Sequence, residues 1–132
     1  MSYLLDTDII IYWLNDAIPN IRNKINSIAN DEIYISSITV AELYFGAYYS
    51  SQVIKNIELL NEFTSELNIL YLDTECGKIF GKIKADLKKE GKIINDSDLF
   101  IASIAINNKM RLVTNNDKHF KRIEDLQVEN WI

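Results

Sequence analysis

The chain has 132 residues, and its composition, 48% hydrophobic and 25% charged, is that of one globular domain with a sizeable core. One cysteine, Cys76, excludes an internal disulfide bond, and the net charge of −5 argues weakly against nucleic acid as a partner. No apolar stretch near the N-terminus is long enough for a membrane span or follows a basic segment. We therefore expect a single cytoplasmic domain over residues 1–132, with Cys76 as a small core residue.

Hydrophobic periodicity predicts that strands and helices alternate along the chain. The expected strands cover residues 3–5, 32–36, 68–72, 111–114 and, more weakly, 127–131. The expected helices cover residues 8–14, 18–30, 37–50, 52–67, 74–90 and 98–107. This alternation predicts an α/β fold with three layers, α/β/α, around a mostly parallel five-stranded central sheet.

Positive charge is concentrated in one segment. Residues 78–92 contain six Lys against Asp86 and Glu90, a local charge of +4 that leaves −9 for the remainder of the chain. A basic segment on an acidic body is compatible with a phosphate-bearing partner, but lysine runs are commonly a solvated helix face. Charge alone leaves both interpretations open.

Several acidic residues near helix starts have a structural explanation, because acids suit the positive end of a helix dipole. Asp8 is expected to cap the first helix. Thr39 is expected to cap the third helix and to form a T-x-x-E capping box with Glu42. Asp96 is the expected cap of the helix over 98–107.

Three acids are not explained by capping alone. Asp6 ends the first strand, Glu42 lies in a helix start, and Asp98 lies in the first turn of an apolar helix. Ligands of parallel α/β folds bind at the carboxyl ends of strands, where Thr114 and Asn116 also lie. Carboxylates that meet there repel one another unless a divalent cation binds, and hard oxygen ligands favour Mg²⁺ or Mn²⁺.

Five stretches resemble one protein family, in order and at the expected spacing over essentially the whole chain. They are "YLLDTDIIIYWL", "ISSITVAELYFGA", "IINDSDLFIASIAI", "LVTNNDKHFKRI" and "VENWI". Together they resemble the PIN-domain ribonucleases, and most closely the toxin component of VapBC-type toxin–antitoxin systems. The resemblance implies a PIN-like fold and a single PIN domain over residues 1–132.

The resemblance also assigns roles to residues. Asp6 matches the first metal-binding aspartate of the family and Asp98 a further metal ligand. Glu42 matches its active-site glutamate, which would complete the coordination of the metal or orient a metal-bound water. Thr114 matches the Thr or Ser at the end of the fourth strand. The fourth acidic position of the family falls at Asn116, which is an amide here. Thr114 and Asn116 would then hold water or a phosphate by hydrogen bonds.

Two neighbouring acids are further candidate metal ligands. Asp117 follows Asn116 and could compensate for it, and Asp96 is a peripheral ligand or a helix cap. The implied activity is that of a Mg²⁺-dependent endoribonuclease toxin of a type II system, with Mn²⁺ as a substitute. It would hydrolyse RNA phosphodiester bonds with a metal-activated water.

The resemblance implies two protein partners, a cognate antitoxin and a second copy of the chain. Aromatic residues cluster after Glu42, and they are Tyr44, Phe45, Tyr48 and Tyr49. Core packing accounts for some of them, and the others suit a homodimer surface or a groove for an antitoxin peptide. The lysines of residues 78–92 would meet the phosphates of an RNA substrate.

Two alternatives remain open. "DTDII" is similar to the opening motif of haloacid dehalogenase-like phosphohydrolases, with Asp6 as nucleophile and Asp8 as general acid, but the other motifs of that fold are not found. A non-catalytic PIN-like binding module is the second alternative, because of Asn116. A zinc site is not expected, because His119 is the only histidine and is interpreted as a surface or structural residue.

Overall fold

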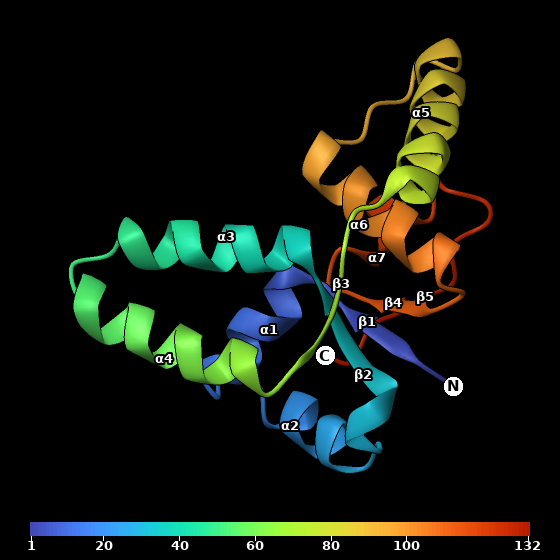
Figure 1. The fold of residues 1–132 in the computed structure, drawn as a ribbon. Coiled ribbons are helices and arrows are strands. Elements are labelled where there is room, and N and C mark those ends of the chain that lie inside the picture. Colours follow the sequence, from blue (N-terminus) through green and yellow to red (C-terminus); the bar gives the residue numbers. More distant parts are fainter.

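A parallel sheet of five strands runs through the middle of the molecule (Figure 1). The computed structural model describes residues 1–132, and its strands lie in the order β3-β2-β1-β4-β5. Their bounds are β1 Tyr3–Leu5, β2 Ile33–Ser36, β3 Asn68–Leu70, β4 Arg111–Val113 and β5 Val128–Glu129. Every neighbouring pair is parallel, which confirms the predicted sheet and brings the carboxyl ends of all strands to one edge.

Seven helices surround this sheet. They are α1 Thr7–Leu14, α2 Pro19–Asn26, α3 Ser37–Tyr48, α4 Val53–Ser65, α5 Thr74–Lys89, α6 Asp96–Asn107 and α7 Asp117–Phe120. A short 3₁₀ turn, η1 at Asn30–Glu32, precedes β2. The six longer helices agree with the predicted ones to within a few residues at their ends. The sequence does not predict α7, because a single helical turn is too short to show an apolar period.

Two hydrophobic clusters cover the two faces of the sheet. Leu4 and Leu5 are both fully buried but belong to different clusters, because successive side chains of a strand point to opposite faces. The Leu4 cluster contains residues of α5 and α6, and the Leu5 cluster contains residues of α1 to α4. The three-layer arrangement is therefore confirmed, and Cys76 is the buried core residue that the sequence predicts.

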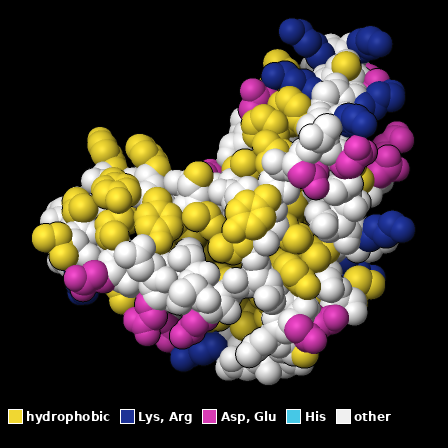
Figure 2. Space-filling view, viewed as in Figure 1, with side chains coloured by type: hydrophobic (Ala, Val, Ile, Leu, Met, Phe, Trp, Pro, Cys, Tyr) yellow, Lys and Arg dark blue, Asp and Glu magenta, His cyan; other side chains and the backbone are white.

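Two pairs of helices give the molecule its outline (Figure 1). In one arm α3 and α4 pack side by side, and in the other α5 packs on α6. Hydrophobic side chains gather in the hollow between the two arms, and Lys and Arg side chains surround the far end of α5 (Figure 2). None of the seven helices has the length and apolar composition that a membrane span requires.

The caps of α1 and α3 correct two predictions. Asp6, not Asp8, is the N-cap of α1, and its carboxylate accepts the backbone N–H of Thr7. Ser36, not Thr39, is the N-cap of α3, so Glu42 is too far along the helix to complete a capping box. Both errors have one cause: each strand runs into the next helix without a loop, so the cap is the last residue of the strand (Ser36) or the residue directly after it (Asp6).

The cap of α6 corrects a third prediction. Asn95, not Asp96, is the N-cap, and its side-chain oxygen accepts the backbone N–H of Asp98 at 2.9 Å. Asn95 has the extended backbone of a cap (φ −63°, ψ 153°), and the helix already includes Asp96. Asp96 therefore does not cap the helix, and its carboxylate forms an ion pair with Lys84 at 2.9 Å instead.

Candidate active site

Asp6 is held rigidly at the carboxyl edge of the sheet. Its side chain lies between β1 and β4, and only 6% of the residue is exposed. One carboxylate oxygen, Oδ1, accepts the backbone N–H of Thr7 at 2.8 Å, and Oδ2 accepts the hydroxyl of Thr114 at 2.8 Å. The orientation of the carboxylate is therefore set by groups from two strand ends that are far apart in the sequence.

Burial, together with the negative charges of Asp8 and Asp98, raises the pKa of Asp6 from its ordinary value to about 7. The hydrogen bonds from Thr114 and Thr7 act in the opposite direction, because they stabilise the ionised form. The rise shows that negative charge at this point is poorly compensated by the protein itself. A cation bound here would supply the missing positive charge.

Asp8 faces the same edge from the first turn of α1. Its Oδ2 accepts the backbone N–H of Asn115 at 3.1 Å, whereas Oδ1 is buried and has no hydrogen-bond partner. Burial is the main cause that raises the pKa of Asp8, and the charge of Asp98 adds to it. A buried carboxylate oxygen without a partner is costly, so Asp8 belongs to the site rather than to a helix cap.

Asp98 approaches this pair from the first turn of α6. Its Oδ2 accepts a hydrogen bond from the side-chain amide of Asn95 at 3.0 Å. The Nε2 atom of His119 lies 3.3 Å from the same oxygen, and the two form an ion pair only when the imidazole is protonated. His119 comes from α7 and is mostly buried, so it is a site residue that the sequence did not suggest. The one signal for His119 in the sequence is its position shortly after the end of β4, at the edge of the sheet where ligands bind.

Glu42 lies near this edge on α3, where it is exposed to solvent. The hydroxyl of Thr7 donates to Glu42 Oε1 at 2.7 Å and lies 3.0 Å from the hydroxyl of Thr39. Thr39 is fully buried, and its backbone N–H donates to the side chain of Ser36. This chain of polar groups ties the start of α1 to the start of α3 and fixes one oxygen of Glu42.

The residues after β4 complete the edge. Thr114 is fully buried, and its Oγ1 accepts the backbone N–H of Asn116 at 3.0 Å while its hydroxyl donates to Asp6. Asn116 is the exposed N-cap residue of α7. Asp117 is turned toward Asn130, whose amide donates to it at 3.3 Å, and toward Lys121 at 3.8 Å. Asp117 therefore has other partners than the inner carboxylates.

The arrangement suits a hard cation in its chemistry, although no preformed coordination sphere is present. No group of three or more His, Cys, Asp or Glu side chains has the spacing of a metal site. The charges of Asp6, Asp8 and Asp98 act on one another, while Glu42 is connected to them through Thr7. The unpartnered oxygen of Asp8 and the raised pKa of Asp6 both indicate room for positive charge among oxygen donors, the ligands that Mg²⁺ prefers.

An apolar groove of about 650 Å³ opens next to Glu42, between α1, α3 and α4. Its walls include Ile11, Leu14 and Phe63, and its rim carries Glu42, Glu62 and Glu66. Farther along α3 three aromatic side chains are exposed, and they are Phe45, Tyr48 and Tyr49. Tyr44, the fourth aromatic residue, packs against the core and donates to Asn61.

Comparison with known proteins shows which family and which solved structure this chain is similar to. The family model "PIN domain" matches residues 3–126. "Ribonuclease VapC2" of Haemophilus influenzae is 40% identical over 132 residues, which are 100% of this chain and 99% of the relative. "tRNA(fMet)-specific endonuclease VapC" of Shigella flexneri is 30% identical over 99% of this chain and 98% of its own. The crystal structure of VapBC2 from Rickettsia felis, bound to a DNA fragment from their promoter, is 39% identical, with a TM-score of 0.91 over 100% of both chains.

Proposed function

Because this chain belongs to the PIN-domain family and resembles VapC ribonucleases over its whole length, we propose that it is a Mg²⁺-dependent endoribonuclease, the toxin of a type II toxin–antitoxin system. The observation that carries the proposal is the buried, poorly compensated negative charge of Asp6 and Asp8 at the carboxyl edge of the sheet, with Asp98 near by. Among the alternatives, a haloacid dehalogenase-like enzyme finds no support in this family membership.

Each residue of the edge has a role in this proposal. Asp6, Asp8 and Asp98 would hold Mg²⁺, which when bound lowers the pKa of an attacking water and offsets charge on the phosphate. Oε1 of Glu42 already accepts the Thr7 hydroxyl, so Oε2 is the oxygen that can accept a hydrogen bond from that water. Thr114 holds Asp6 in place, and the side-chain amide of the exposed Asn116 would donate to a phosphate oxygen.

The RNA that this enzyme cleaves is the next question. The Shigella flexneri relative is named for its action on tRNA(fMet), and at 30% identity it makes that tRNA the first substrate to examine. We propose a structured RNA with an accessible single-stranded segment, because the acids lie at an open edge of the sheet rather than in a closed cavity.

The proposal is tested by metal binding and cleavage in parallel. Mn²⁺ is titrated calorimetrically into the wild type, Asp98→Asn and Asp96→Asn, and each protein is then incubated with tRNA(fMet) and with total RNA in Mg²⁺. We expect Asp98→Asn to lose both metal binding and discrete RNA fragments. Asp96→Asn is the matched control, because this residue lies on the same helical turn but pairs with Lys84.

Two outcomes would contradict the proposal in different ways. Metal binding without cleavage of any RNA would favour a non-catalytic binding module. Absence of metal binding by the wild type would mean that the carboxylates do not act together, and the proposed mechanism would be wrong at its base.

We also propose two protein partners. An antitoxin segment with apolar and basic side chains would suit the groove between α1, α3 and α4, because three glutamates rim its apolar walls. The exposed aromatics Phe45, Tyr48 and Tyr49 suit the core of a homodimer interface. Sizing with light scattering at micromolar concentration should give a dimer, and a monomer would contradict this part.

A further inference from the structure

A small pocket edged by lysines lies between the end of α5 and the start of α6. Its volume is about 180 Å³, and it is lined by Lys84, Leu87, Lys88, Lys92, Ile93, Ile94 and Leu99. The floor is apolar, since Leu87, Ile94 and Leu99 are buried in the core. The rim is cationic, and Ile93 is exposed beside it. Such a pocket can accept an anionic group at its rim and an apolar group on its floor.

Two of the three lysines share one side of α5, and the third follows the end of that helix. Lys84 and Lys88 are one helical turn apart, and Gly91, with φ of +73°, ends the helix in a left-handed turn that is followed by Lys92. The backbone N–H of Lys92 donates to the carbonyl of Leu87 at 2.9 Å, which fixes this turn. The rim of the pocket is therefore formed by a helix end of defined shape.

The charges of these lysines are only weakly satisfied. Lys84 pairs with Asp96 at 2.9 Å and Lys92 with Glu90 at 3.6 Å, and all four side chains are about half exposed or more. Exposed ion pairs of this kind are weak, so a phosphate can compete for both ammonium groups. No carboxylate forms an ion pair with Lys88.

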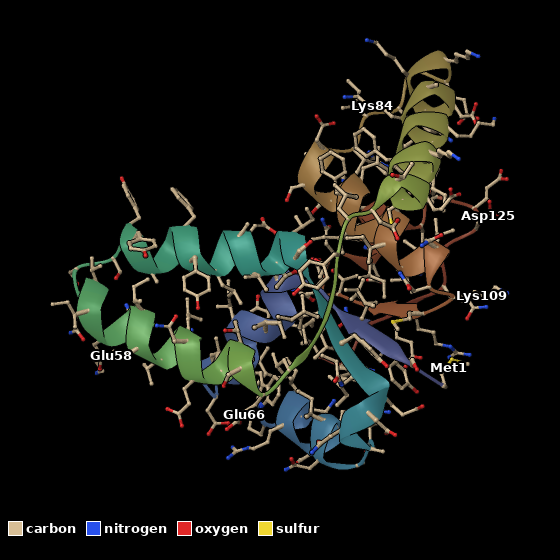
Figure 3. The ribbon with its side chains drawn as sticks, viewed as in Figure 1. Met1, Glu58, Glu66, Lys84, Lys109 and Asp125 are labelled. Atoms are coloured by element: carbon tan, nitrogen blue, oxygen red, sulfur yellow. The ribbon has the colours of Figure 1, made fainter.

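The pocket adjoins the candidate active site. Leu99 in its floor directly follows Asp98, and Lys84 reaches Asp96 on the same first turn of α6. The connecting loop is also held from the other side, because the guanidinium of Arg122 donates to the carbonyl of Ile93 at 3.0 Å. Figure 3 shows Lys84 beside this loop, on the arm of α5 and α6, whereas Glu66 of the apolar groove lies at the end of α4.

We propose that this pocket binds a backbone phosphate of the RNA substrate close to the bond that is cleaved, with the adjoining sugar or base on the apolar floor. This inference rests on the proposed function. The body of the protein is acidic, with −9 outside residues 78–92, so an RNA needs a local cationic contact beside the site. Lysines at the rim of an apolar floor provide that contact without selecting a particular base.

An acidic segment of the antitoxin is the competing occupant, and the charges favour RNA. The groove that suits an antitoxin is rimmed by Glu42, Glu62 and Glu66, so it selects a basic segment rather than an acidic one. The lysine pocket lies on the other arm, and one of its lining residues, Leu99, directly follows Asp98 in α6. An occupant of this pocket is thus placed to continue into the active site.

The experiment compares two triple variants that remove the same charge from the same segment. Lys84, Lys88 and Lys92 are changed to Ala in one, and Lys78, Lys82 and Lys89, which lie outside the pocket, are changed to Ala in the other. Both are made in the Asp98→Asn background, and the affinity for fluorescein-labelled tRNA is measured by fluorescence anisotropy at several salt concentrations. Cleavage by the same triple variants with Asp98 intact gives kcat and KM.

The pocket variant should bind the tRNA about tenfold more weakly than the control, with a salt dependence shallower by about one to two units of slope. Its KM should rise while kcat changes little, because the lysines do not touch the reacting atoms. Circular dichroism checks that both variants fold. If the pocket triple is unfolded, Lys88→Glu against Lys89→Glu gives the same comparison with one substitution each.

The outcomes separate this inference from the proposed function. If the wild type cleaves RNA and the two triple variants bind it equally, the pocket inference is wrong and the function stands. If the pocket triple binds tRNA like the control but binds a fluorescein-labelled acidic peptide more weakly, the pocket takes an acidic protein segment and the inference is again wrong. If the wild type cleaves no RNA, the proposed function fails, and the inference that rests on it fails too.

Discussion

The inner acids, Asp6 and Asp8, and the rim acids, Asp96 and Asp117, lie at the same edge of the sheet but in different surroundings. The inner pair is largely buried, and burial raises both pKa values. The rim pair is neutralised by lysines, Lys84 at 2.9 Å and Lys121 at 3.8 Å. The comparison teaches that the negative charge of the rim acids is paired with lysines, whereas that of the inner acids has no cationic partner in the protein. A bound cation would compensate the inner charge.

The largest difference between the two pairs should be in catalysis. Asp8→Asn removes a negative charge beside Asp6 and should lower the rate of RNA cleavage by about a hundredfold or more. Asp117→Asn, which loses contacts with Asn130 and Lys121 only, should stay within about threefold of the wild type. Equal rates for the two variants, measured by single-turnover cleavage, would abolish the distinction between inner and rim acids.

A smaller effect is expected on the stability of the metal-free protein. The pKa of Asp6 is about 7 in the folded state, above its ordinary value, so between about pH 4 and pH 7 the folded chain keeps a proton that the unfolded chain has lost. Stability from this group is therefore present at low pH and falls as pH rises through that window. Asp6→Asn removes the charge and should stabilise the protein by about 2 kcal/mol at about pH 8.

Urea unfolding in EDTA measures this effect. The advantage of Asp6→Asn should vanish below about pH 4, where the Asp6 carboxyl is protonated in the unfolded as well as in the folded state. Asp96→Asn serves as the comparison, because an exposed pair such as Asp96 with Lys84 contributes at most about 1 kcal/mol at any pH. An advantage of Asp6→Asn that does not depend on pH would mean that its cause is not the carboxylate charge.

The smallest expected effect concerns Glu42, which is positioned through Thr7. Thr7→Val keeps the shape of the side chain but removes the hydroxyl that donates to Glu42, and kcat should fall about tenfold with KM unchanged. Thr7→Ser restores the donor and should recover most of the activity. A variant Thr7→Val that melts early but retains kcat at low temperature would instead assign Thr7 a purely structural role.

The fold could be predicted from the sequence because each element carries its own pattern. Apolar runs such as Tyr3–Leu5 and helical stripes such as that of α5 are local signals, and the parallel order follows from their alternation. The helix caps were mispredicted one to three residues late, and for α1 and α3 the reason is that β1 and β2 run directly into the helix at Asp6 and Ser36. A propensity rule cannot detect such a shared residue.

The candidate site could be predicted only in part, because some of its contacts join distant segments. Asp6, Glu42, Asp98 and Thr114 lie at or close to the same sheet edge, and their roles stay predictions. Asp8 was taken for a cap because its partner, the backbone of Asn115, is 107 residues away. His119 was taken for a surface or structural residue because its contact with Asp98 depends on α7, which has no periodic pattern.

The hydrogen bond between Thr114 and Asp6 joins residues that are 108 positions apart, so it can form only late in the synthesis of the chain. Strand β1, which Asp6 follows, leaves the ribosome first, but its neighbour β4 and the acid of α6 are made near the end. Local contacts in the nascent chain cannot form this edge of the sheet, so a chain that ends before β4 has no assembled site. The candidate site of this protein therefore assembles only when translation is almost complete.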